Sequence, residues 1–84
     1  MLSLKKIQSL VDCSDITDLG KIDERYIFKD GTRVLQKRNY IKGTAKIDDN
    51  RITWFGVRET EISSKDIGII VEDVYVNGKK VTEL

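Results

Sequence analysis

The feature that most constrains this chain is a set of three turn-forming dipeptides, each flanked by segments rich in β-branched and aromatic residues. The dipeptides are Asp30-Gly31, Asp49-Asn50 and Asn77-Gly78. Asn, Asp and Gly readily adopt the positive backbone angles that two-residue hairpin loops require. The chain has no proline, so no strand lacks a backbone donor. The sequence therefore predicts antiparallel hairpins over about residues 22–38, 42–58 and 67–84.

An amphipathic helix is predicted ahead of the hairpins, over about residues 3–12. Apolar residues recur there at the three- and four-residue spacing of one helix face, and Ser3 suits the N-cap. Residues 12–20 contain Asp, Ser and Gly, which predict the end of the helix and a connection.

Residues 61–76 carry conflicting signals. Ser63 and Asp66 resemble a helix capping box, whereas Gly68 and the β-branched residues after it favour a strand. We predict a strand over about residues 67–76.

Together these elements predict one α+β domain, mostly β, over residues 1–84. A short N-terminal helix should pack on a strongly bent antiparallel sheet of five or six strands. We expect the sheet to close into a small barrel of the general SH3-like, Sm-like or OB-like shape. Such a shape does not by itself define a function.

The second hairpin sets Trp54 beside Phe55, and neighbouring residues of a strand point to opposite faces. With residues 49–50 as the loop, Ala45 faces Trp54 and Gly43 lies on the same side. These small residues leave room for the indole, so we expect Trp54 in the core. Phe55 is then either covered by the helix or a second sheet layer, or exposed as a contact site. A one-residue change of register would exchange the two faces.

The first hairpin has no clean apolar face. Tyr26, Phe28 and Leu35 share one face with charged residues, and Ile27 and Val34 lie on the other. This pattern predicts a strand pair that is partly covered on both faces.

Cations and aromatic residues gather in the middle of the chain. Residues 21–46 hold eight basic and three acidic side chains, and residues 47–84 hold five and eight. Either the basic segment binds an anionic partner, or the two segments neutralise one another across neighbouring strands. Residues 35–43 are also typical of a solvated edge strand. The candidate binding residues are Lys37, Arg38, Tyr40, Lys42, Lys46, Arg51 and Phe55.

The composition argues against catalysis. There is no histidine and one cysteine, which excludes Ser-His and Cys-His pairs, histidine metal sites and multi-thiolate sites. Cys13 is expected to be a small buried side chain, and Glu59 and Glu61 a solvated strand end. We therefore expect no enzyme, no catalytic residue, no metal site and no cofactor.

The single cysteine cannot form an internal disulfide, which suits a reducing compartment, and we expect a cytoplasmic protein. The apolar stretch at the N-terminus is too short and polar for a signal peptide, and no segment has the length of a membrane span. We therefore expect no membrane partner. The abundance of Lys, Ile and Asp, without His or Pro, is in keeping with bacterial or phage origin.

Two functions of different classes follow. The first is a non-enzymatic protein-interaction module, such as a small regulator, inhibitor or accessory subunit, that binds through a strand edge or the Phe55 face. The alternative is a small β-barrel nucleic-acid-binding protein that uses its basic and aromatic face. A net charge of +1 favours the first. Homo-oligomerisation through an edge strand is compatible with both.

Overall fold

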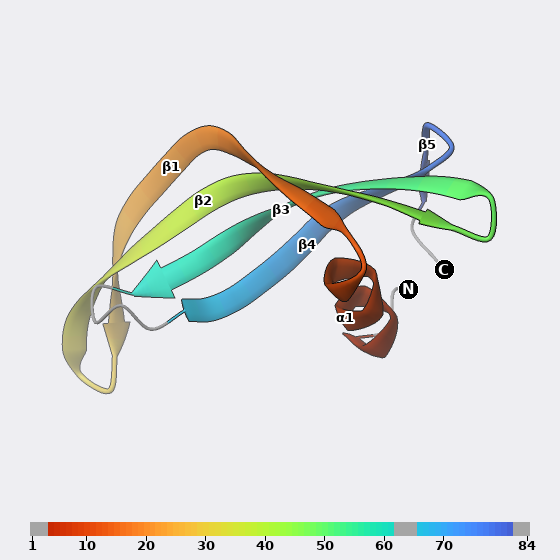
Figure 1. Ribbon diagram of the computed structural model, residues 1–84. Helices are drawn as coiled ribbons and strands as arrows, with labels where there is room; N and C mark the ends of the chain where they lie inside the picture. Colours follow the sequence, from red (N-terminus) through yellow and green to blue (C-terminus); the bar gives the residue numbers. More distant parts are fainter. Residues whose placement is uncertain (1–3, 62–65, 82–84) are drawn as a thin grey trace.

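The computed structural model describes residues 4–61 and 66–81, which form one helix and one antiparallel sheet (Figure 1). The elements are α1 (Leu4–Asp12), β1 (Asp15–Lys29), β2 (Thr32–Ile47), β3 (Asn50–Glu61), β4 (Asp66–Val76) and β5 (Lys79–Val81). Each strand pairs with the next in chain order. Among the described residues the sheet has five strands and β1 does not pair with β5, so the expected closure into a barrel is not confirmed.

The predicted helix is confirmed at Leu4–Asp12, and the ambiguous segment is a strand from Asp66 onward. The suggested caps at Ser3 and Ser63, and the end of the third hairpin at residues 82–84, lie outside the described residues.

β1 begins at Asp15, seven residues before the expected start at residue 22. Its pairing with β2 is interrupted by a bulge between Asp18 and Ile22. There Gly20 has a φ of 76°, and its N–H donates a hydrogen bond to Asp18 Oδ1 at 2.7 Å. The turn-forming residues of this segment therefore shape a bulge within a strand, and not the expected connection.

The first and third hairpin loops are Asp30-Gly31 and Asn77-Gly78, as predicted. The second loop is Asp48-Asp49, one residue earlier than expected, and both residues have positive φ angles. The pairing of β2 with β3 therefore differs from the expected register by two residues, which leaves every side chain on its predicted face. As a consequence Gly43, and not Ala45, lies opposite Trp54.

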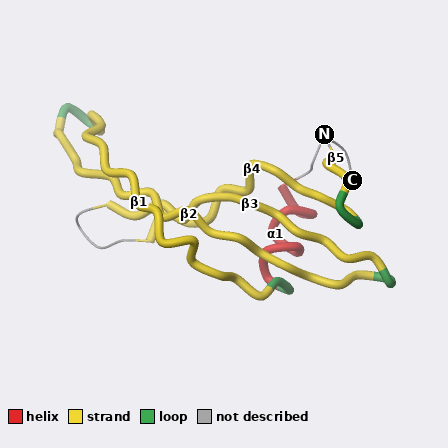
Figure 2. The backbone as a smooth tube through the Cα atoms, turned by 90° about the horizontal axis from the view of Figure 1, so that it is seen from above, coloured by secondary structure: helices red, strands yellow, loops and turns green. Residues whose placement is uncertain are grey.

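The two faces of the sheet are unlike. α1 packs on one of them, which we call the helix face, and its buried residues are Leu10 of α1 with Ile41, Ile52, Trp54 and Val74 of the sheet. The other face, which we call the open face, is not covered by α1. Residues 26–35 form the end of the β1–β2 hairpin, which projects at the opposite end of the molecule from α1 (Figure 2); we call this segment the arm.

Trp54 is the centre of the helix-face core, as predicted, and is 0% exposed. A Cβ atom on Gly43 would overlap its indole ring, so the space for the ring depends on a residue without a side chain. The indole Nε1–H donates to Ser14 Oγ at 2.8 Å, and that hydroxyl donates to the Leu10 carbonyl at 2.6 Å. Ser14 thus links the end of α1 to the buried ring, and no polar atom of Trp54 is left unsatisfied.

Gly43→Ala tests this packing. The added methyl group must displace the indole, so we expect the free energy of unfolding to fall by roughly 1–3 kcal/mol. Chemical denaturation followed by Trp54 fluorescence measures the change. The control is Thr44→Ala at the next position, which is exposed and points to the open face, and should change stability by less than about 0.5 kcal/mol. Equal stability of Gly43→Ala and the wild type would contradict the packing.

Candidate functional site

The seven predicted binding residues do not form one site. β2 lies between β1 and β3, so its residues 35–43 are not an edge strand, contrary to one interpretation of the sequence. The structure separates the candidates into three groups by face and position. Lys37 is on the helix face; Arg38 and Tyr40 are on the open face toward the arm; Lys42, Lys46, Arg51 and Phe55 are on the open face at the other end.

On the open face toward the arm, three basic side chains, Arg25, Lys29 and Arg38, are neutralised by carboxylates. Glu59 Oε2 lies 3.3 Å from Arg38 Nε and 3.9 Å from an Arg25 guanidinium nitrogen, and Lys29 pairs with Glu61 at 3.0 Å. Glu59 is buried, so its expected place at a solvated strand end is wrong. Arg38 Nε is close to Glu59 but lacks hydrogen-bond geometry, so this contact is an ion pair and not a hydrogen bond. Neutralisation across neighbouring strands is therefore the correct account of these charges.

Tyr40 is also engaged within the protein. Its hydroxyl donates to Asp23 Oδ2 at 2.6 Å, and Lys21 Nζ lies 4.7 Å from its ring centroid. The hydrogen bond to the Asp23 carboxylate raises the pKa of Tyr40 above its ordinary value of 10.0. Lys37, on the other face, lies 3.8 Å from Glu24 Oε1. Neither Tyr40 nor Lys37 therefore contributes to the group of predicted residues around Phe55.

The remaining predicted residues lie together with one that the sequence did not single out. Lys46 is directly opposite Arg51, and Lys42 is opposite Phe55. The Phe55 and Tyr75 rings meet edge to face, with centroids 5.9 Å apart, and Lys42 Nζ is 6.0 Å from the Phe55 centroid. We call Lys42, Lys46, Arg51, Phe55 and Tyr75 the cationic patch.

No carboxylate of the described residues lies within ion-pair distance of the three cations of this patch. Phe55 and Tyr75 are both partly exposed. The patch is therefore the part of the predicted site that keeps its charge and its rings available.

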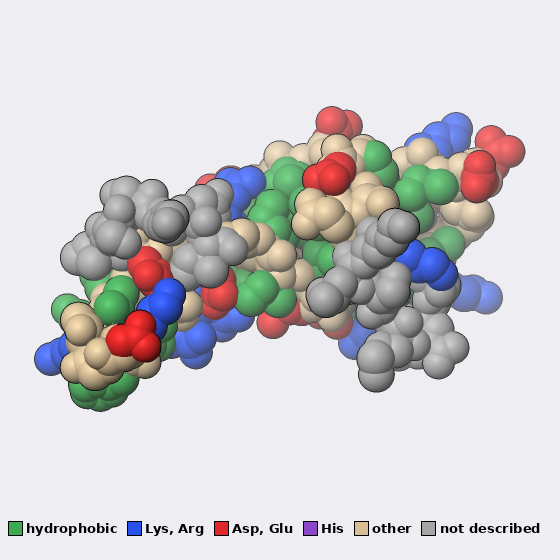
Figure 3. Space-filling model, turned by 90° about the horizontal axis from the view of Figure 1, so that it is seen from below, with side chains coloured by type: hydrophobic (Ala, Val, Ile, Leu, Met, Phe, Trp, Pro, Cys, Tyr) green, Lys and Arg blue, Asp and Glu red, His purple; other side chains and the backbone are tan. Residues whose placement is uncertain are grey.

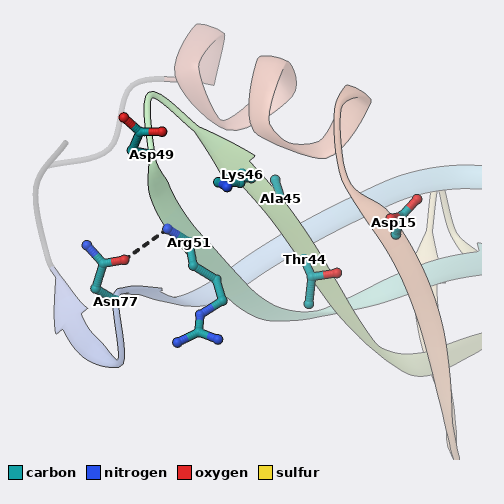
Figure 4. Close-up of a pocket in the computed structure, with 7 residues that line it drawn as sticks. All are labelled: Asp15, Thr44, Ala45, Lys46, Asp49, Arg51 and Asn77. Carbon is teal, nitrogen blue, oxygen red and sulfur yellow. Dashed lines mark hydrogen bonds between the residues drawn. The ribbon is translucent and has the colours of Figure 1, made fainter.

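A hollow of about 520 Å³ adjoins the patch (Figure 4). Asn77 fixes the backbone of Arg51 beside this hollow through two hydrogen bonds. The backbone N–H of Arg51 donates to Asn77 Oδ1 at 2.9 Å, and the backbone N–H of Asn77 donates to the Arg51 carbonyl at 2.8 Å. The lining residues are Asp15, Thr44, Ala45, Lys46, Asp49, Arg51 and Asn77. The hollow therefore offers two cations and two carboxylates, together with a hydroxyl and an amide.

A second exposed surface was not predicted. Ile22, Tyr26 and Phe28 of β1 are 55%, 60% and 82% exposed, and we call them the β1 row. Their register places them on the same side of the sheet as the helix-face core, but at the arm end, where hydrophobic side chains are visible at the surface in Figure 3. Arg33 covers part of Tyr26, with its guanidinium carbon 3.9 Å from the ring centroid. The hairpin pattern gave the shared face of Tyr26 and Phe28 correctly, but the partial cover expected on both faces is wrong for these two residues, which the described elements leave exposed.

The structure gives less support to a metal site, a membrane-spanning helix or a buried cysteine. The part of the chain that the structure describes has no group of three metal-ligating side chains, and none of its helices is long and apolar enough to span a bilayer. Cys13 is exposed, and its Sγ donates to the Leu10 carbonyl at 3.4 Å, so its expected burial is wrong.

Comparison of the chain with protein-family models, curated proteins and solved structures gives no significant match. The cationic patch and the β1 row are therefore the features of the molecule that bear on its function.

The Tyr40–Asp23 hydrogen bond can be tested by titration. Because Asp23 raises the pKa of Tyr40, Asp23→Asn should lower that pKa toward the ordinary value, as measured from Tyr40 ring-carbon chemical shifts against pH. A group whose pKa is higher in the folded state stabilises the fold at pH values below its unfolded-state pKa. This stabilisation is lost as the pH rises through the folded-state pKa. Tyr40→Phe should therefore weaken the fold at neutral pH, and the loss should shrink above about pH 10. An unchanged Tyr40 titration in Asp23→Asn would contradict the assignment.

Proposed function

We propose that the protein is a non-enzymatic interaction module that binds another protein through β1. The observation that carries this proposal is the exposure of the β1 row, with Phe28 82% exposed. Exposed apolar side chains that gather on one face of a domain mark interaction surfaces. Glu24 lies between Ile22 and Tyr26 on this face, so Tyr26 and Phe28 are the adjacent apolar pair. An additional exposed apolar residue, Leu19, lies at the bulge of the same strand.

The backbone of β1 supports the same role. β1 pairs with β2 on one side and has no strand partner on the other side among the described residues. The loop Asp30-Gly31 joins Lys29 and Thr32, which are the hydrogen-bonded pair that closes a two-residue hairpin. Along an antiparallel strand, the backbone N–H and C=O groups of successive residues point alternately toward and away from the partner strand. Counting from Lys29, the groups of Glu24 and of the β1 row therefore point away from β2.

The partner that fits this surface is an extended segment of another protein that adds as a strand beside β1. In this mode backbone hydrogen bonds supply affinity, and alternate side chains supply selectivity. The pairing of residues 22–29 with β2 has no bulge, so the outward backbone groups form an unbroken row for such a strand. A small regulator, inhibitor or accessory subunit acts in this way, by occupying a partner.

Peptides selected from a random display library on the immobilised protein test the proposal. We expect selected peptides to shift the amide signals of residues 22–29. Phe28→Ser should weaken their binding about 30- to 100-fold, because it removes a large apolar contact. The control is Ile47→Ser, which changes another exposed apolar residue (39% exposed) outside the arm and should have no effect.

A second pair of variants isolates the backbone. Glu24→Pro removes a backbone N–H that points away from β2, and it leaves the hydrogen bonds between β1 and β2 in place. It should weaken peptide binding roughly tenfold. Glu24→Ala keeps that N–H while losing the contact with Lys37, and should bind as the wild type does. Peptide binding that survives both Phe28→Ser and Glu24→Pro, or that shifts residues outside β1, would contradict the proposal. Sedimentation of the protein alone shows whether a second copy occupies the same edge.

A further inference from the structure

The end of the open face near α1 differs from the arm side in the state of its charges. Toward the arm, Arg25, Arg38 and Lys29 each have a carboxylate within 4 Å. In the cationic patch, Lys46 and Arg51 occupy directly opposed positions on neighbouring strands, where like charges repel. A bound anion between or beside them would relieve this repulsion.

Aromatic rings lie one and two residue pairs further along the same face. Thr44 and Thr53 are opposite each other between the Lys46–Arg51 pair and the Lys42–Phe55 pair, and Tyr75 is next to Thr53 on β4. Because the Phe55 and Tyr75 rings are perpendicular, they form a corner in which a flat ring can rest on one and touch the edge of the other. The contact of Lys42 with Phe55, at 6.0 Å, is at the outer limit for a cation–π interaction and can give way to a ligand.

The acidic neighbours limit how strong the site can be. Asp73, opposite Phe55, is held by Lys80 at 3.1 Å and so is already neutralised. Asp15 and Asp49 line the adjoining hollow and oppose an anion there. Three cations against these two carboxylates favour a ligand with few phosphates and a weak affinity that depends strongly on salt.

We propose that the cationic patch binds single-stranded nucleic acid, with phosphates at Lys46 and Arg51 and a base on the Phe55–Tyr75 corner. A single strand suits this surface because its bases are free to stack on protein rings, whereas those of a duplex are stacked on one another. The patch is on the opposite face from the β1 row, so this inference does not depend on the proposed function.

Fluorescence anisotropy with labelled oligothymidylate and oligouridylate of about eight nucleotides tests the inference. At low salt we expect saturable binding to the wild-type protein. The three cations can neutralise up to three phosphates. The logarithm of the association constant should therefore fall with the logarithm of the salt concentration, with a slope of about −2. Absence of binding at low salt would overturn the inference.

Matched variants separate the two halves of the site. Lys46→Ala/Arg51→Ala should weaken binding at least about tenfold and flatten the salt slope, since it removes two phosphate contacts. Phe55→Leu/Tyr75→Leu should weaken binding about 5- to 100-fold and leave the slope unchanged, since it removes stacking and not charge. Lys37→Ala is the control, because Lys37 is a cation on the helix face, paired with Glu24, and its loss should leave binding unchanged. Circular dichroism establishes that each variant is folded.

Two outcomes would overturn the inference even if binding is seen. An equal loss of affinity in Lys37→Ala would mean that attraction to the protein as a whole, and not this patch, holds the oligonucleotide. Competition by polyphosphate as effective as by unlabelled oligonucleotide, together with unchanged binding by Phe55→Leu/Tyr75→Leu, would mean that bases are not recognised.

Discussion

The structure depends on the docking of α1 against Trp54. The ring is fully buried, it occupies the space that Gly43 leaves open, and Ser14 satisfies its N–H group. Each feature needs the others: a side chain at residue 43 would exclude the ring, and a buried indole N–H without a partner would be costly. One interaction thus fixes the position of the helix and the face of β3 that the helix covers.

A nine-residue helix can cover one end of a sheet whose two longest strands have 15 and 16 residues. The molecule measures 46 by 26 by 19 Å, so much of the sheet lies beyond the helix. The uncovered parts are stabilised in different ways. The ion pairs of Glu59 and Glu61 join strands on the open face. In the β1 row, Arg33 covers part of Tyr26, and Phe28 remains 82% exposed. The cations of the cationic patch likewise have no carboxylate partner among residues 4–61 and 66–81. These two surfaces are therefore where the fold leaves interactions unmade, and where a partner can supply them.

The sequence predicted the order of elements, two of the three loops and the burial of Trp54, because Asp-Gly, Asn-Gly and strand alternation have strong local causes. The second loop was misplaced by one residue since Asp48, Asp49 and Asn50 all tolerate positive φ. The start of β1 was missed because Asp and Gly are typical both of a bulge within a strand and of a connection between elements. Asp18 and Gly20 therefore did not distinguish the two. Pairing between distant residues decided the rest. Glu59 forms an ion pair with Arg38, and Phe28 stays exposed because no described element covers its side of the arm.

One helix covers Trp54 and leaves the β1 row and the cationic patch open to solvent. Relaxation of proton signals by a neutral paramagnetic co-solute measures this directly in the isolated protein. We expect strong broadening of the Phe28 and Tyr26 ring signals and of the Lys46 and Arg51 side-chain signals, with a protected Trp54 indole N–H. Broadening of the Trp54 indole signal, or protection of Phe28 in dilute solution, would contradict this arrangement.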